Sequence, residues 1–138
     1  MGTVTPVPVT SGPTGRQVFE YALLRAVPRV DRGECVNIGV VLYCRGQEFL
    51  RTAVEVDDQR VRALDPHVDL ATLHSAADAV RRTCAGDGPA GETTLGQRFR
   101  WLTAPRSTVV QAGPVHGGLT ADPAADLDRL LRALVRRP

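Results

Sequence analysis

Three polar residues stand close together at the start of an apolar run: Arg32, Glu34 and Asn37. In a functional site the guanidinium could bind an anion, the carboxylate could accept a proton, and the amide could orient a substrate. The same side chains could instead serve the fold, with Arg32 paired to Glu34 and Asn37 hydrogen-bonded to a loop backbone. We favour the structural interpretation, because such ion pairs are common where no reaction takes place. Their position beside the apolar run predicts that some of them are partly buried.

A second polar group combines arginines with the only tryptophan of the chain. Arg100 precedes Trp101, and Arg106 follows a few residues later. The indole could stack on a ligand while the arginines bind phosphate. Alternatively, Phe99 and Trp101 anchor a short helix to the sheet while the arginines reach solvent. We favour anchoring for the two aromatic residues, whereas Arg100 and Arg106 are equally suited to either role.

Ser107 and His116 complete the set of candidate site residues. His116 lies in a glycine-rich segment, residues 113–118, which is typical of a loop; there it could act as a general base or be an ordinary loop residue. A Ser-His-acid triad can be written with Glu34, but no G-x-S-x-G turn surrounds the serine. The histidines and cysteines lack metal-ligand spacing, so we expect neither a metal nor a cofactor.

The composition excludes several classes of function. All 17 basic residues are arginine, so chemistry that needs a lysine amine, as in Schiff-base enzymes, P-loops and protein-kinase cores, is absent. A formal charge of +2 and an aromatic content of 4% argue against a nucleic-acid partner. Whether the chain is an enzyme stays open, but it contains no recognisable catalytic set.

The organisation along the chain is that of one domain with a leader. Residues 1–16 are rich in Thr, Pro and Gly and predict a flexible leader, followed by a single domain over residues 17–138. The N-terminus lacks the basic start of a secretory signal, and no apolar run approaches the ~20 residues of a membrane span. We therefore expect a cytoplasmic protein that does not enter a membrane.

Alternating and apolar segments predict an antiparallel sheet of about four strands. Residues 18–27, 35–44 and 48–56 form an N-terminal meander, in which the second strand is apolar enough to be buried on both faces. Residues 107–111 are the fourth strand. Helices are expected at 57–64, 69–85 and 97–102.

The last helix has the most complete local signals. Asp122 is a suitable N-cap, and Pro123 occupies the first helical position. Apolar residues at helical spacing form one stripe, and the arginines near the end complement the helix dipole. The stripe consists of Leu127, Leu130, Leu131, Leu134 and Val135. The fold class is therefore α+β, with an antiparallel sheet packed against helices and a C-terminal amphipathic helix.

Several motifs together resemble the bacterial family of unknown function DUF3037. The likeness extends over residues 17–134, and its motifs follow the family's order. The segments that carry it are Tyr21-Ala22-Leu23-Leu24-Arg25-Ala26-Val27-Pro28, Arg32-Gly33-Glu34, Asn37-Ile38-Gly39-Val40, Arg98-Phe99-Arg100-Trp101, Pro105-Arg106-Ser107 and His116-Gly117-Gly118-Leu119.

The resemblance implies a small cytoplasmic protein, often encoded beside a HipA-like kinase, with no established activity. We therefore expect an accessory or binding module that acts with such a kinase. The alternative is a small enzyme or ligand-binding protein with an anion-binding pocket formed by Arg32, Glu34, Asn37, Arg106 and His116. A second copy of the chain could also be a partner, because the exposed edge of a small meander invites pairing.

Overall fold

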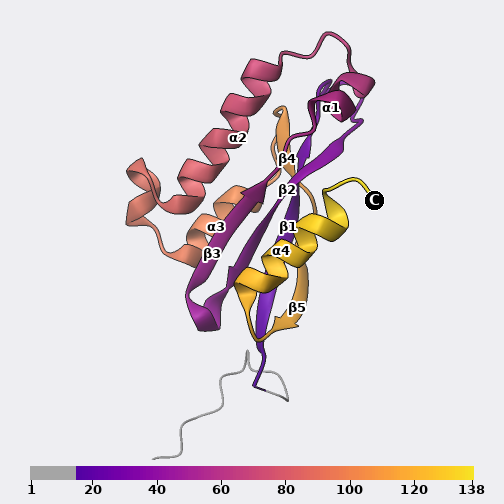
Figure 1. Cartoon of the computed structure of the whole chain (residues 1–138). Helices are drawn as coiled ribbons and strands as arrows, with labels where there is room; N and C mark the ends of the chain where they lie inside the picture. Colours follow the sequence, from indigo (N-terminus) through magenta and orange to yellow (C-terminus); the bar gives the residue numbers. More distant parts are fainter. Residues whose placement is uncertain (1–14) are drawn as a thin grey trace, which may run out of the picture.

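The computed structural model describes residues 15–138 (Figure 1). The predicted leader, residues 1–16, therefore lies almost wholly outside the described residues and stays a prediction. The strands are β1 (Gln17–Ala26), β2 (Val36–Cys44), β3 (Phe49–Val54), β4 (Val110–Ala112) and β5 (His116–Thr120). The helices are α1 (Asp58–Leu64), α2 (Leu70–Ala85), α3 (Leu95–Thr103) and α4 (Pro123–Leu134), with 3₁₀ turns at Arg45–Gln47 and Gly88–Glu92.

The strands form one antiparallel sheet with β1 and β2 at its centre. Strand β3 pairs with the outer side of β2, and β4 and β5 pair in succession with the outer side of β1. Helices α2 and α3 contact one face of the sheet, and α4 contacts the other (Figure 1). The predicted α+β class and its C-terminal helix are confirmed.

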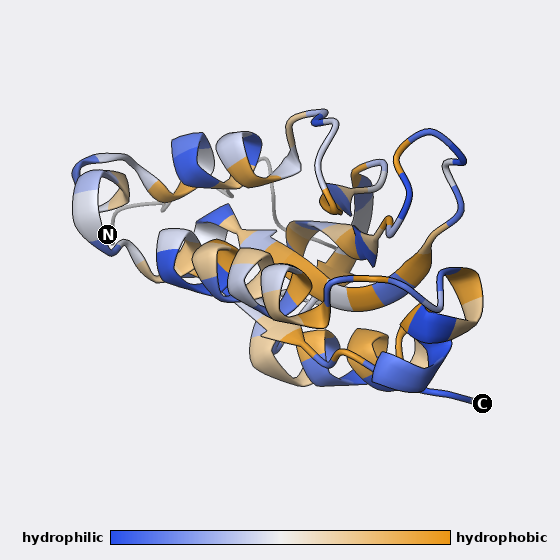
Figure 2. Ribbon diagram, turned by 90° about the horizontal axis from the view of Figure 1, so that it is seen from above, coloured by the Kyte–Doolittle hydropathy of each residue, from blue (hydrophilic) through white to orange (hydrophobic). Residues whose placement is uncertain are grey.

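Each face of the sheet has its own hydrophobic cluster. Figure 2 shows hydrophobic residues concentrated in the sheet and on the helix faces turned toward it. The cluster beneath α2 and α3 contains Ile38 and Phe99, whereas the cluster beneath α4 contains Phe19, Val40 and Leu42. The apolar run in β2 is thus buried on both sides, as the sequence predicts.

The helix ends follow from side chains that satisfy the first backbone N–H groups. Asp57, Asp69 and Asp122 accept hydrogen bonds from the first turns of α1, α2 and α4. Gly86 ends α2 at a φ of 87°, a left-handed conformation that glycine adopts without strain. Among residues 15–138, no helix is both long and apolar enough to cross a membrane.

The prediction that residues 113–118 form a loop is wrong, because the segment contains the start of β5. The two adjacent glycines have low strand propensity and typify a loop. Strand pairing overrides that preference: Phe19 of β1 pairs with Gly118, and its ring covers the glycine so closely that a Cβ there would lie 2.6 Å from the ring atom Cε1. The adjoining Gly117 has no such contact, since a Cβ would meet nothing nearer than the Phe19 carbonyl oxygen at 3.7 Å.

This difference predicts opposite effects of two neighbouring substitutions. Gly118→Ala should destabilise the fold by about 1–3 kcal/mol, because the new methyl group collides with a buried ring. Gly117→Ala should be neutral or stabilise the fold by up to about 1 kcal/mol through the entropy of the unfolded chain. Urea unfolding of both variants measures the two effects, and equal losses of stability would contradict this packing.

Candidate functional site

Arg32 and Glu34 lie in the loop between β1 and β2 and bind each other. Arg32 Nε donates to Glu34 Oε1 over 2.5 Å, and the two side chains are 54% and 46% exposed. This ion pair lowers the pKa of the Glu34 carboxyl. The predicted pairing is confirmed. Both side chains are exposed, because the loop extends past the last β1–β2 pair before the apolar strand begins, and of the three polar residues only Asn37 is partly buried.

Asn37 of β2 supports the end of α4. Its Nδ2 donates to the backbone carbonyl of Leu134 over 3.0 Å, which satisfies one of the carbonyls left free in the last turn of the helix. The predicted hydrogen bond from Asn37 to the backbone is present, but its acceptor lies at the end of a helix and not in a loop. The side chain fixes the position of α4 against the sheet.

The structure separates His116 from the Arg32 loop along β1. His116 is exposed and lies opposite Tyr21, with the two rings 5.3 Å apart. The Arg32 loop leaves the other end of β1, where Val27 N donates to the carbonyl of Val109. About five strand residues, or roughly 16 Å, lie between these positions. The convergence of the five proposed anion-binding residues on one pocket stays a prediction, and none of them lines the two cavities described below.

Helix α3 presents the aromatic and arginine residues differently from the sequence prediction. Phe99 is buried under the sheet, as expected, but Trp101 is 63% exposed. Two residues correspond to about 200° around a helix, so Trp101 points away from the face that buries Phe99. Arg98, also on α3, is buried and donates to the carbonyls of Cys84, Ala90 and Thr93.

Trp101 and Arg106 form a stacked pair at the surface. The guanidinium carbon of Arg106 lies 4.8 Å from the centroid of the Trp101 ring, and the same guanidinium donates to the Trp101 carbonyl. Trp101 also lines a cavity of about 520 Å³ beside α2 and the Gly88–Glu92 turn. Pro89 and Ala90 contribute apolar surface to that cavity, and the buried Arg98 forms part of its wall. This combination is the candidate binding site.

Arg100 and Ser107 lie apart from the stacked pair. Arg100 is exposed and lines a cavity of about 700 Å³ between the N-terminus of α3 and the exposed part of β1. Glu20, Arg45 and Glu48 line the same cavity, so its charges are mixed and it shows no preference for an anion. Ser107 is exposed in the irregular segment before β4.

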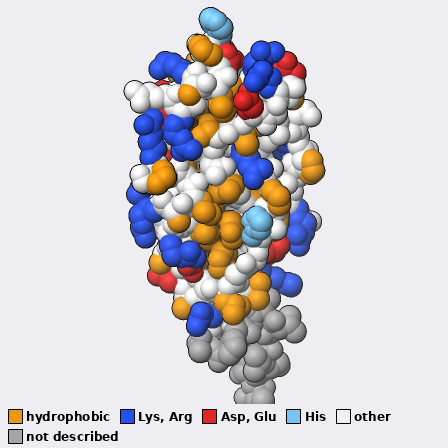
Figure 3. Space-filling model, turned by 90° about the vertical axis from the view of Figure 1, so that its right-hand side faces the viewer, with side chains coloured by type: hydrophobic (Ala, Val, Ile, Leu, Met, Phe, Trp, Pro, Cys, Tyr) orange, Lys and Arg blue, Asp and Glu red, His pale blue; other side chains and the backbone are white. Residues whose placement is uncertain are grey.

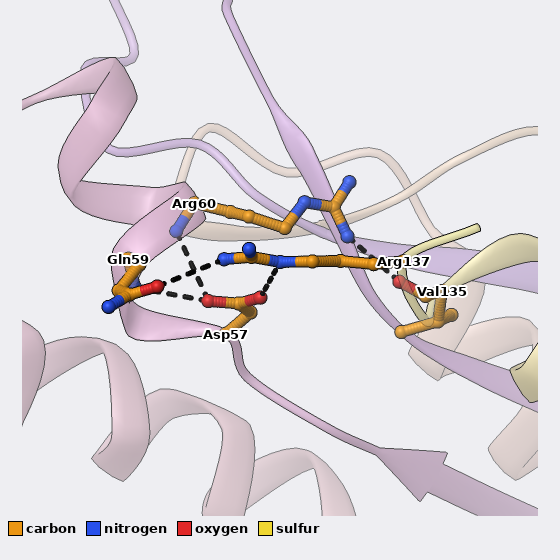
Figure 4. Close-up of polar contacts among 5 residues, drawn as sticks. All are labelled: Asp57, Gln59, Arg60, Val135 and Arg137. Atoms are coloured by element: carbon orange, nitrogen blue, oxygen red, sulfur yellow. Dashed lines mark hydrogen bonds and ion pairs between the residues drawn. The ribbon is translucent and has the colours of Figure 1, made fainter.

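A cluster of polar contacts that the sequence analysis missed holds the C-terminal residues (Figure 4). Arg137 Nε lies 2.6 Å from Asp57 Oδ2, and Arg60 Nη1 donates to the Val135 carbonyl over 2.9 Å. Arg136 Nη2 and Nε both contact the carboxylate of Glu55. The terminal arginines were expected to act on the helix dipole, but they bind carboxylates about 80 residues away. No local pattern could have revealed these partners.

Within residues 15–138, no group of three metal-ligating side chains is close enough to hold a metal ion. Of the three cysteines, Cys35 is exposed, whereas Cys44 and Cys84 are buried, and all three are free thiols. Burial raises the pKa of the Cys84 thiol.

The comparisons with known proteins identify one family. Residues 21–135 match the family described as protein of unknown function (DUF3037). The chain belongs to the DUF3037 family. No curated protein and no solved structure matches it. For a DUF3037 protein, the matched range places both the Arg32 loop and the Trp101–Arg106 pair inside the family's common part.

The C-terminal contacts predict a pH-dependent contribution to stability. Arg137 and Arg136 lower the folded-state pKa values of Asp57 and Glu55, so these pairs stabilise the fold above the unfolded carboxyl values near 4. That contribution is lost as the pH falls through the lowered folded-state values. The double variant Arg136→Gln/Arg137→Gln should therefore unfold at a lower temperature than the parent at pH 7, and the difference should shrink toward about pH 3.

Thermal unfolding followed by circular dichroism across this pH range measures the effect. Arg132→Gln is the control for a lost positive charge, since it removes one charge from the last turn of α4 without touching Glu55 or Asp57. A deficit of the double variant that stays constant from pH 7 to 3 would show that the two ion pairs are not its cause.

Proposed function

We propose that this DUF3037 protein is a non-catalytic binding module whose Trp101–Arg106 surface recognises a protein partner. The partner implied by the family resemblance is a HipA-like kinase. The observation that carries the proposal is the exposed tryptophan stacked with an arginine beside an apolar cavity. The accessory role of the protein follows from this recognition.

The stacked pair has the composition of a protein-binding hot spot. Tryptophan and arginine are among the residues that most often carry binding energy at interfaces, where each buries a large area. Arg106 is already held by the Trp101 ring and carbonyl, so little further ordering is needed on binding. The neighbouring cavity of about 520 Å³ can accept an apolar side chain of the partner.

Two other candidate residues, Arg32 and Asn37, are already engaged in contacts within the chain, which argues against a catalytic role for them. Arg32 is paired with Glu34, and Asn37 is bonded to the end of α4. Using either residue on a substrate would require breaking an intramolecular contact. Trp101, in contrast, has most of its surface available.

The proposal predicts that Trp101→Ala weakens binding to a HipA-like kinase by at least about tenfold, measured by calorimetry with the full chain. The expected loss follows from removing the largest exposed aromatic surface. Val30→Ala is the matched control, because Val30 is 46% exposed and lies in the β1–β2 loop, outside the proposed surface. Its affinity should equal that of the parent.

The single tryptophan also gives a direct readout. A chain labelled with 5-fluorotryptophan has one fluorine resonance, which should shift when the kinase covers Trp101 and stay unchanged with an unrelated protein. Binding without any shift of this resonance would place the interface elsewhere. Absence of binding at micromolar concentrations would overturn the kinase as the partner.

A further inference from the structure

The sheet has two edges, and they differ in how they are protected. Strand β3 forms one edge, and β4 and β5 form the other. An edge strand carries unpaired N–H and C=O groups that can pair with another chain, and most proteins block this with charges, bulges or covering elements.

The β3 edge is protected. Arg51 places a charge on the strand, and helices α2 and α4 both contact β3. Arg81 of α2 donates from Nη2 to the Val54 carbonyl over 3.3 Å. Pairing of a second chain along β3 would therefore bring like charges together and displace an existing hydrogen bond.

Within residues 15–138, none of these protections is found along residues 115–120 of the β5 edge. The stretch contains no charged residue and exposes two large apolar side chains, Val115 at 44% and Leu119 at 43%. Figure 3 shows the side of the molecule that carries β5 and α4, with hydrophobic side chains gathered along its middle. Pro114 limits the open part of the edge to the residues that follow it.

Gly117 has no role within the chain that requires glycine. Its φ is not positive, and a Cβ at this position would make only ordinary contact with the Phe19 carbonyl. Gly118 differs, since the Phe19 ring occupies the space of its missing side chain. A small residue at position 117 is explained if another backbone or side chain approaches from outside.

We propose that the β5 edge pairs with β5 of a second copy of this chain, antiparallel and centred on Gly117. A two-fold axis perpendicular to the sheet joins the two sheets with the same face up. Each residue must therefore pair with a partner residue whose side chain lies on the same face of the joined sheet. Pairing Gly117 with the partner's Gly117 meets this condition. It also places Leu119 opposite the partner's Val115, and the reverse contact follows from the symmetry.

The sequence of the strand is complementary to itself in this register. Val115 and Leu119 are placed symmetrically about Gly117, so the dimer buries four exposed apolar side chains in two pairs. His116 stands opposite the partner's Gly118, which leaves room for the imidazole. No like charges meet, because the stretch carries none. The inference is independent of the Trp101 surface, which lies on α3.

The paired stretch is short, so we expect a weak dimer that dissociates on dilution. Sedimentation velocity of the full chain between about 10 µM and 1 mM should show a concentration-dependent increase in mass. Leu119→Arg should raise the dissociation constant at least about tenfold by placing a charge on the edge. Val30→Arg, which adds the same charge to the β1–β2 loop, should leave it unchanged.

A disulfide tests the register. In a Cys35→Ser background, Gly117→Cys should oxidise to a covalent dimer, because directly opposed strand residues have the Cα separation that a disulfide requires. Val30→Cys in the same background is the control and should crosslink at least about tenfold more slowly. A chain that stays monomeric throughout the concentration range overturns the proposal. Dimerisation that Leu119→Arg does not weaken, or equal crosslinking of the two cysteine variants, overturns it as well.

Discussion

The packing of both layers depends on one irregularity in the pairing of β1 with β2. Leu24 pairs with Gly39 and Arg25 with Asn37, so Ile38 is an extra residue that bulges from the ladder. The bulge reverses the alternation along β2. Val36 and Ile38 therefore face α2 and α3. Beyond the bulge the even-numbered residues Val40, Leu42 and Cys44 face α4. The ladder is secured by Glu55, whose N–H donates to the Ile38 carbonyl over 2.7 Å.

The same bulge positions the C-terminal helix. Asn37, which it places on the α4 face, holds the Leu134 carbonyl, and the chain beyond α4 is then fixed by Glu55 and Asp57. Residues 55–57 follow β3 directly, so one short connection receives contacts from β2 and from the C-terminal residues. The position of α4 thus depends on polar contacts at its end as well as on its apolar stripe.

Local patterns predicted the elements whose signals lie within a few residues. The N-cap of α4, the end of α2 at Gly86 and the apolar run of β2 all carry their own information. Strand β5 was missed because its stability comes from β1 and from the Phe19 ring, not from Gly117 and Gly118 themselves. Sequence reasoning selected Arg106 and Trp101 together but predicted that the tryptophan anchors the helix to the sheet. Trp101 is exposed instead, because the buried residues Phe99 and Leu102 decide which face of α3 turns toward the core. The partners of the terminal arginines depend on tertiary structure alone.

The lysine-free composition has a consequence for the ion pairs. Of the seven found in residues 15–138, six use an arginine and the seventh joins His74 to Asp58. A guanidinium keeps its proton far above the pH near 10 at which a lysine ammonium loses its own. The six arginine pairs therefore persist in strongly alkaline solution. There the buried Cys84 thiol, whose pKa burial raises, opposes folding, because its ionised form is disfavoured inside the fold.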